Sequence, residues 1–354
     1  MPEPPDRWRG RGAATNPPNR FVAHSLEPDP DWDPADDPRP QTQFLPDRSQ
    51  SVISRNDSPD LPFRASLNPY RGCEHGCAYC FARPTHEFLG FSAGLDFESR
   101  ILVKADAPEL LRAELASARW QPQLLALSGV TDPYQPVERR LEITRRCLAV
   151  LAEFRNPVSI VTKNALVTRD LDHLAELARH RAVAVNLSIT SLDAELARKL
   201  EPRASVPARR LATLSKLAAA GIPAGVLVAP VIPGLNDHEI PAIIAAAAEA
   251  GARWAATMVV RLPLAVAPLF TAWLEHHLPD RKEKVLGRIE SMRGGRLNDP
   301  RFGVRMRGEG TIADQIAQLG RVACRRAGLD RESPELNSAA FRRPGGVQGE
   351  LPLA

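Results

Sequence analysis

The stretch "NPYRGCEHGCAYCFARP", residues 68–84, determines how this sequence is read. It holds three of the chain's five cysteines, Cys73, Cys77 and Cys80, in a C-x3-C-x2-C spacing. In a reducing compartment, clustered thiols are typical of metal ligands or redox catalysts rather than of disulfides. The rest of the sequence has to show which of these chemistries the three thiols serve.

Composition narrows the class of protein. The chain has 354 residues, of which 44% are hydrophobic, and this supports one large domain or two small ones. The polar N-terminus lacks the apolar core of a signal peptide, and no apolar run is long enough to span a membrane. We therefore expect a cytoplasmic protein with no membrane partner.

The order of predicted elements indicates an α/β fold. Residues 1–60 contain twelve prolines and few large apolar residues, which predicts an extended, largely coil N-terminal arm. Short β-like runs then alternate with helical runs through residues 61–265, and this alternation favours βαβ units and a parallel sheet. A helical C-terminal extension is predicted over residues 266–330 and a tail over 331–354. The strands are expected at 124–128, 157–162, 182–190, 224–229 and 254–260, and the intervening helices at 138–154, 169–180, 191–199, 207–220 and 236–250.

The strand "AVAVNLSIT", residues 182–190, has one polar face. Because strand side chains alternate, Asn186, Ser188 and Thr190 point to the side opposite the valines. Strands in the middle of a parallel sheet are usually apolar on both faces. We expect this face to line a polar ligand inside a barrel; the alternative is a face turned to solvent.

A structural zinc site is one reading of the three thiols, but it needs a fourth ligand. Cys147 shares a predicted helix face with apolar residues and Cys324 lies between arginines of the last helix, so neither is expected to be a ligand. His75 or His86 could complete a zinc site in an interaction module. A redox dithiol of the "CAYC" type is the third reading.

An iron–sulfur cube fits the three thiols better. Such clusters are held by cysteine thiolates at short loop spacings, usually four of them. Three thiolates leave one iron without a protein ligand, and an open coordination position is a feature of catalytic metal sites. The redox dithiol, by contrast, leaves Cys73 without a role.

The motif also resembles that of a known family. C-x3-C-x2-C with an aromatic residue before the last cysteine is similar to the cluster motif of the radical S-adenosylmethionine (SAM) enzymes. The segments "SGVTDPYQPVE", "IVTKN" and "APVIPGLND" resemble the branch related to spore photoproduct lyase, often described as DNA-repair-photolyase-like. The resemblance covers roughly residues 60–330, and "GRGAATNPPNRF" in the arm is similar to close relatives.

The resemblance implies a partial (β/α)6 radical SAM barrel with the cluster loop after its first strand. It implies a [4Fe-4S] cluster whose open iron chelates S-adenosyl-L-methionine, and an electron donor such as flavodoxin or ferredoxin. The reduced cluster then cleaves the sulfonium to a 5′-deoxyadenosyl radical, which abstracts hydrogen from an unidentified substrate. The cofactors carry this chemistry, while the protein positions them.

The resemblance also assigns cofactor-binding residues, since ligands of such folds lie at the carboxyl ends of the strands. Tyr79 matches the family aromatic beside the adenine. The chain has "SGVTDP" where many members have a Gly-Gly-Glu run for the cofactor amino group, so Thr131 and Asp132 are expected to substitute for it. The carboxylate and ribose are expected to meet Lys163, Ser188, Thr190 and either Arg203 or Arg210.

The substrate is not indicated by these motifs. Spore photoproduct lyases return hydrogen from a cysteine near the second strand, but this chain has no cysteine between Cys80 and Cys147. Residues 281–343 carry fifteen Lys and Arg against eight acids, a charge of +7, whereas residues 1–60 carry −4. The basic segment is compatible with a nucleic-acid partner; pairing with arm aspartates near residues 29–37 is the alternative.

Overall fold

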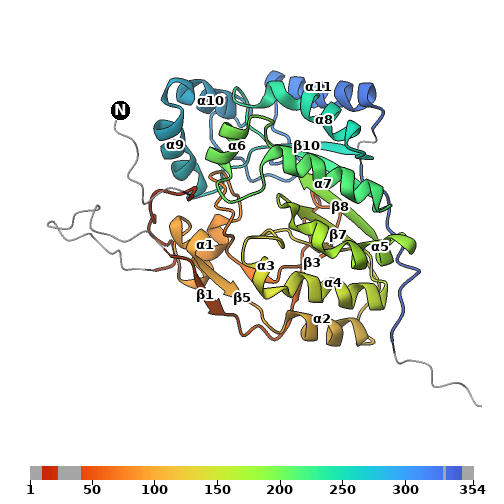
Figure 1. The fold of residues 1–354 in the computed structure, drawn as a ribbon. Coiled ribbons are helices and arrows are strands. Elements are labelled where there is room, and N and C mark those ends of the chain that lie inside the picture. The colour runs from red at the N-terminus through yellow and green to blue at the C-terminus, as the bar shows by residue number, and fades with distance from the viewer. Residues whose placement is uncertain (1–9, 23–40, 330–331, 345–354) are drawn as a thin grey trace, which may run out of the picture.

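The computed structural model describes residues 10–22, 41–329 and 332–344 (Figure 1). Its centre is a seven-stranded sheet in the order β10-β9-β8-β7-β6-β3-β2. The strands of this sheet are β2 (Ile53–Arg55), β3 (Ala65–Leu67), β6 (Leu125–Leu127), β7 (Val158–Thr162), β8 (Val183–Ser188), β9 (Ala224–Val231) and β10 (Ala255–Val259).

Six of these strands make an incomplete α/β barrel. From β3 to β10 every neighbouring pair is parallel, and the order in the sheet follows the order in the chain. Repeated crossovers of one hand curve such a sheet toward a barrel. Among the described strands nothing joins β10 to β2, so the barrel stays open. This confirms the expected α/β class and the partial barrel.

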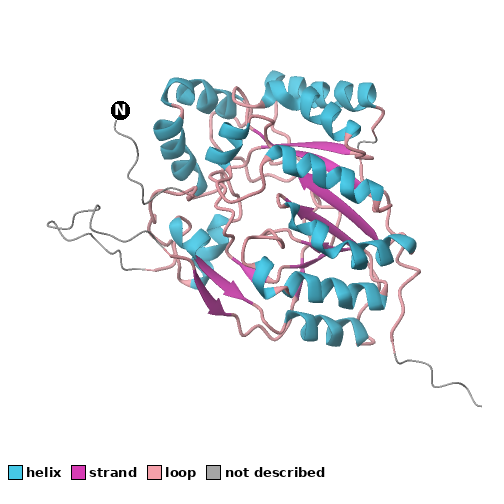
Figure 2. Ribbon diagram, viewed as in Figure 1, coloured by secondary structure: helices cyan, strands magenta, loops and turns pink. Residues whose placement is uncertain are grey.

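Helices cover the outside of the sheet (Figure 2). Those between β6 and β10 lie close to the predicted ranges, whereas the helical elements between β3 and β6 were not predicted. Most strand-to-strand crossovers contain at least one helix, often preceded by a short 3-10 turn. These elements are η3 (Arg83–Leu89), α1 (Leu95–Ser99), α2 (Ala107–Ala116), α3 (Glu138–Leu141), α4 (Ile143–Phe154), η4 (Ala165–Asp170), α5 (Leu171–Arg179), α6 (Ala194–Leu200), α7 (Pro207–Ala219), η5 (Asp237–Glu239) and α8 (Ile240–Glu249).

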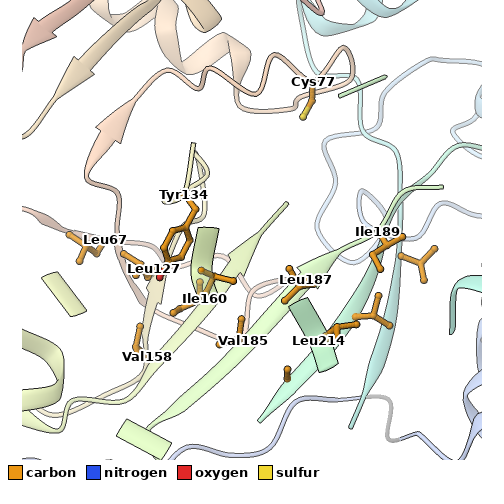
Figure 3. Close-up of a cluster of buried hydrophobic side chains, with 14 of the residues drawn as sticks. Leu67, Cys77, Leu127, Tyr134, Val158, Ile160, Val185, Leu187, Ile189 and Leu214 are labelled. Carbon is orange, nitrogen blue, oxygen red and sulfur yellow. The ribbon is translucent and has the colours of Figure 1, made fainter. Parts of the chain in front are cut away.

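The two faces of the sheet differ as the sequence of β8 suggests. One face is aliphatic: Val185, Leu187 and their neighbours in other strands pack with Leu214 of α7 in the core (Figure 3). On the other face, the residues that lie side by side with Ser159 across the neighbouring strands are small or polar, and they include Ser66 and Ala184. Ser66 and Ser159 stay partly accessible, as expected for the lining of an open barrel interior.

The floor of this interior is closed by Trp254. Its indole nitrogen donates to Asn186 Oδ1 at 2.8 Å, and its ring lies so close to Gly225 that a Cβ there would come within 2.2 Å of it. Asn186 also donates to Ser159 Oγ. The side-chain amide of Asn186 therefore has its hydrogen-bond partners within the protein, whereas Ser188 and Thr190 lie nearer the open end.

Part of the predicted arm is built into the fold. β2 pairs antiparallel with β3, and β1 (Gln43–Pro46) pairs with β5 (Arg100–Val103) in a second sheet completed by β4 (Tyr70–Arg71). Both arm strands are short and largely exposed. They have too few alternating residues to be recognised alone, because pairing partners far along the chain stabilise them.

The C-terminal extension is helical, as expected, except for one long loop. It contains α9 (Val266–His277), α10 (Pro279–Ser291) and α11 (Thr311–Ala327), and α11 packs on α8 and β10. Residues 332–344 run along the outside of the barrel, where Phe341 meets Phe154 of α4 with ring centroids 6.1 Å apart. In the described part of the chain, none of the helices has the length and apolar character to cross a membrane.

Candidate active site

The three cysteines lie on the loop between β4 and η3, which we call the cluster loop (residues 72–82). Cys73 and Cys77 are buried, Cys80 is partly exposed, and all three are free thiols. The loop is fixed by backbone hydrogen bonds from Cys73 N to Phe97 O, at 2.9 Å, and from Ala78 N to Leu200 O, at 3.0 Å. The cysteine backbone is thus anchored to two separate helices or helix ends.

The surroundings of the thiols require a compensating positive charge. Burial raises the pKa of Cys73, and the Asp132 carboxylate and the other two sulfur atoms raise it further. Burial is also the main cause that raises the pKa values of Cys77 and Cys80. Three thiolates would be unstable here without a bound cation, and metal coordination supplies that charge.

The donor set fits a multi-iron cluster better than a single ion. Among the described residues, no three His, Cys, Asp or Glu side chains converge as ligands of one metal ion. A cube binds each thiolate at a different corner, so its ligands need not converge on one point. Three soft sulfur donors on one short loop are the ligand type that iron–sulfur clusters use.

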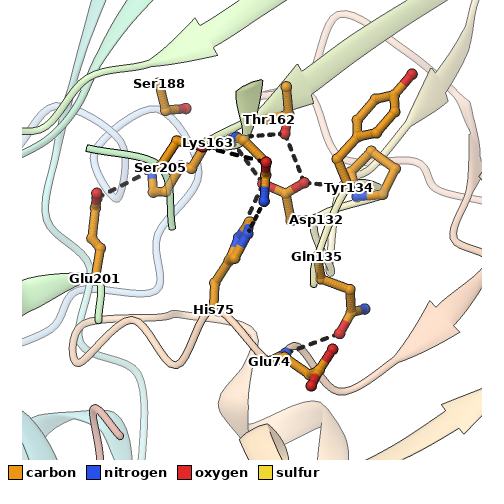
Figure 4. A network of polar contacts seen from close by, with 12 residues as sticks. Glu74, His75, Asp132, Tyr134, Gln135, Thr162, Lys163, Ser188, Glu201 and Ser205 are labelled. Atoms are coloured by element: carbon orange, nitrogen blue, oxygen red, sulfur yellow. Dashed lines mark hydrogen bonds and ion pairs between the residues drawn. The ribbon is translucent and has the colours of Figure 1, made fainter. Parts of the chain in front are cut away.

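Asp132, just beyond β6, connects the cluster loop to the strand ends (Figure 4). Its carboxylate accepts hydrogen bonds from Thr162 Oγ1 at 2.8 Å and from the backbone N–H of Lys163 at 2.7 Å, and it lies 3.3 Å from His75 Nδ1. Burial alone would raise the pKa of Asp132, but the His75 side chain and the backbone N–H groups of Lys163 and Tyr134 lower it. The other His75 nitrogen meets Asn164 at 3.2 Å.

Glu201, the residue that caps α6, is the centre of a second buried network. Its carboxylate accepts hydrogen bonds from Tyr79 and Thr190, is paired with Arg210, and lies 3.6 Å from Lys163 Nζ. Burial would raise the pKa of Glu201, but Arg210 and Lys163, together with the two hydroxyl donors, lower it to about 2. Glu201 is therefore ionised at neutral pH.

Three of the predicted cofactor residues, Tyr79, Lys163 and Thr190, are brought together by Glu201. Lys163 is 15% exposed, and its Nζ also donates to Ala229 O at 3.2 Å and lies 5.9 Å from the centroid of the Tyr79 ring. Ser188 faces the same space (Figure 4), and in the described part of the chain its hydroxyl has no hydrogen-bond partner. Lys163 and Ser188 therefore offer a cation and an available hydroxyl at this end of the interior.

The other predicted residues have different partners. Thr131 donates its hydroxyl to Tyr70 O at 3.1 Å and is buried. Arg203 lies behind the cluster loop, where its guanidinium is 3.3 Å from Glu74 Oε1 and 3.3 Å from Thr42 Oγ1. Arg210 is buried against Glu201. Their assignment to the cofactor stays a prediction.

A segment of the arm around Gly12 and Ala13, which we call the strap, packs against the cluster loop from outside. The amide nitrogens of Gly12 and Ala13 donate to the two oxygens of Glu98, at 3.0 and 2.9 Å, and Arg83 pairs with the same carboxylate. A Cβ on Gly12 would lie 1.6 Å from Gly76 O, so only glycine fits there. Neither the strap nor the role of Glu201 was predicted from the sequence. The similarity of "GRGAATNPPNRF" to close relatives was the one available signal for the strap.

The segment after β6 has an unusual backbone. Ser128 has φ of 124°, a region that non-glycine residues rarely adopt, and Gly129 follows with φ of 125°. Strained backbone of this kind clusters at functional sites. Val130, next in the chain and 38% exposed, stands in the region that the resemblance compares with the hydrogen-returning cysteine.

Sequence families and curated proteins include relatives of this chain. The model of the Radical SAM superfamily matches residues 67–247. An uncharacterized protein of Mycobacterium tuberculosis is 39% identical over 222 residues, which are 62% of this chain and 65% of that protein. An uncharacterized protein of Methanocaldococcus jannaschii is 29% identical over 173 residues, 49% of this chain and 62% of that protein. The chain thus spans less than two thirds of the length of either relative.

Solved structures share the fold. Spore photoproduct lyase complexed with dinucleoside spore photoproduct superposes with a TM-score of 0.58 and 16% identity, over 80% of this chain and 79% of that chain. A double mutant of the same enzyme with bound AdoMet and dinucleoside spore photoproduct gives 0.57 and 17%, over 80% and 78%. At this identity the likeness establishes a common architecture, while the substrate of this chain is a separate question.

Proposed function

Since this chain belongs to the Radical SAM superfamily, whose members use a [4Fe-4S] cluster and SAM, we propose that Cys73, Cys77 and Cys80 hold that cluster. The enzyme then uses SAM to abstract hydrogen from its substrate. The observation that carries the proposal is the position of the cluster loop, which holds three free thiols: Tyr79 of this loop is joined to Lys163 through Glu201, and the Lys163 charge lowers the pKa values of Cys77 and Cys80 against the effect of burial. When bound, the reduced cluster supplies the electron that cleaves SAM to a 5′-deoxyadenosyl radical.

The residues of this chain bind and orient SAM. Lys163 offers a cation for the SAM carboxylate, in a position that Glu201 and the Ala229 carbonyl fix. The Ser188 hydroxyl donates to the carboxylate or ribose. Tyr79 and Thr190, joined by Glu201, form the wall beside the adenine. The low exposure of these groups excludes water from the reacting atoms.

The amino group of SAM is assigned to the segment after β6. Thr131 and Asp132 are the proposed substitutes for the Gly-Gly-Glu run. Both are already bonded within the protein, so we propose that they act mainly by holding the loop, with the Asp132 carboxylate adding negative charge near the amine. Arg203 holds the back of the cluster loop through Glu74. The electron donor is proposed to be a flavodoxin or ferredoxin.

Anaerobic reconstitution tests the cluster assignment. The parent protein should be brown and hold about four irons per chain, and Ala at any one of Cys73, Cys77 or Cys80 should remove the iron–sulfur absorbance. Cys147→Ala and Cys324→Ala are the matched controls and should keep it, because these cysteines are buried in α4 and α11 and do not belong to the cluster loop. A colourless protein that contains zinc would contradict the proposal, as would a Cys77→Ala variant with full iron content.

Reduction with dithionite in the presence of SAM then tests the activity. The reconstituted parent should form 5′-deoxyadenosine slowly without substrate, and a candidate substrate should accelerate it. Absence of the product from protein with a full iron content would contradict the proposed reaction while leaving the cluster in place.

A further inference from the structure

Three arginines gather where β10 ends, at the rim of the barrel. Arg261 follows β10 directly, and the long loop between α10 and α11, residues 292–310, brings Arg293 and Arg305 to the same place. The loop is tied to the strand because Val259 N donates to Met306 O at 3.2 Å and Arg293 Nη2 donates to Val260 O at 2.6 Å. This loop lies within residues 281–343, the segment whose positive charge stands out in the sequence.

Arg261 lies directly beside the cluster loop. Its guanidinium carbon is 4.7 Å from the centroid of the Phe81 ring, and Phe81 is the residue after Cys80. Phe81 is 41% exposed, so the pair lies at the protein surface next to the cluster loop. The one hydrogen bond that Arg261 makes within the described residues is to the Met306 sulfur, at 3.3 Å, and sulfur is a weak acceptor.

Arg293 is almost completely buried, at 2% exposure. Its Nη2 serves the carbonyls of Val260 and Arg305. Its Nε and Nη1 are buried and have no hydrogen-bond partner among the described residues. Buried donors without partners are rare in native proteins, and each one calls for a specific explanation.

The positive charge of these arginines exceeds the negative charge of the acidic residues paired with them. Arg305 is paired with Asp60, at 2.5 Å, and Arg301 with Asp299 and Glu309. Neither Arg261 nor Arg293 has an ion pair within the described part of the chain. Burial, together with the charges of Arg305 and Arg293, lowers the pKa of Arg261 to about 10, although the Asp60 carboxylate acts in the opposite direction. An uncompensated buried cation destabilises a protein. A bound anion would compensate the charges of Arg261 and Arg293.

We propose that Arg261 and Arg293 form a subsite that binds a phosphate group of the substrate at the rim of the barrel. The inference rests on the proposed function, since it places the substrate beside the cluster loop. The planar guanidinium of an arginine can donate two parallel hydrogen bonds either to a phosphate or to a carboxylate. A carboxylate has two oxygens in one plane, however, whereas a phosphate group offers three or more oxygens in different directions. It can therefore accept from two forks at once.

Titration calorimetry on the reconstituted full-length protein tests the subsite, with inorganic pyrophosphate as the probe and malonate as the carboxylate control. Arg261→Met should weaken pyrophosphate binding roughly ten- to 150-fold, the loss expected for charged hydrogen bonds. Arg296→Met, an exposed arginine of the same loop, is the matched control and should bind like the parent. Malonate should bind more weakly than pyrophosphate.

The chain's own acidic residues are the competing occupant. Asp29, Asp31, Asp33, Asp36 and Asp37 lie outside the described residues, so the titration is repeated with all five changed to Asn. If pyrophosphate binds to neither protein, or binds Arg261→Met as tightly as the parent, the subsite does not exist. If malonate binds as tightly as pyrophosphate, the phosphate assignment is wrong. Iron content is measured on the same samples, so a failure of the cluster is distinguished from a failure of the anion site.

Discussion

At the scale of single residues, the site depends on a carboxylate that no motif identifies. Glu201 belongs to a helix end, yet its partners come from the cluster loop, from the segments just after β7 and β8, and from α7. The sequence of α6 shows only an acidic residue after an amphipathic helix. No short sequence pattern indicates that such distant segments meet at Glu201. The three cysteines, by contrast, lie close together in the sequence, so their site could be predicted from their spacing.

Glu201 makes stability depend on pH in a defined window. Its pKa is lowered from the usual 4.5 to about 2, so it stabilises the fold above pH 4.5 and this contribution disappears as pH falls toward 2. The contribution is on the order of 3 kcal/mol, at about 1.4 kcal/mol per pKa unit. Urea unfolding of cluster-free protein measures it: Glu201→Gln should be less stable at pH 7 and should lose less stability than the parent between pH 4.5 and 2. Parallel pH curves for the two proteins would contradict the role of Glu201.

Lys163 and Ser188 are predicted to control SAM affinity without affecting the cluster. Lys163→Ala and Ser188→Ala should each keep the iron–sulfur absorbance. Loss of a charged hydrogen bond costs about 1.5–3 kcal/mol, so the Kd of Lys163→Ala should rise roughly ten- to 150-fold, and that of Ser188→Ala by a smaller factor. Equilibrium binding of radiolabelled SAM gives the values. Lys216→Ala, on the exposed side of α7, is the control, and an unchanged Kd in Lys163→Ala would refute the carboxylate assignment.

At the scale of elements, hydrophobic periodicity predicted most of the barrel correctly. β7, β8 and β9 begin and end within two residues of the predicted runs, because a buried strand between two helices carries a strong local pattern. β1 and β2 were not predicted, since each has at most four residues and depends on pairing with a distant strand. The strap around the cluster loop was missed for a similar reason: it is held by Glu98, far away in the sequence.

The strap is expected to protect the cluster. Gly12→Ala places a Cβ against Gly76 O and should displace the strap, so that a chelator removes iron from the reconstituted protein several-fold faster. The rate of absorbance loss after addition of EDTA measures this. Gly287→Ala is the control, because a Cβ there meets nothing within 4 Å. Equal rates for the parent and Gly12→Ala would show that the strap has no protective role.

At the scale of the whole molecule, the singly wound sheet brings together what the sequence keeps apart. The parallel order β3-β6-β7-β8-β9-β10 places the carboxyl ends of all six strands at one rim, which is why Arg261, after β10, meets Phe81 of the cluster loop. Parallel topology could be predicted from the alternation of strands and helices. The glycine-rich stretch that carries Arg293 and Arg305 could be predicted to be a loop, but its position at this rim could not, because it has neither helical nor strand periodicity.

The central claim is that the cluster on Cys73, Cys77 and Cys80 has an open iron that binds SAM directly. The most direct test is electron–nuclear double resonance on the reduced, reconstituted protein with SAM labelled with ¹⁵N at the amino group and ¹⁷O at the carboxylate. The account predicts that both labels couple to the cluster spin in the parent, and that Lys163→Ala weakens binding while leaving the couplings of the bound fraction in place. A reduced cluster that shows no coupling to either label, with saturating SAM present, would contradict it.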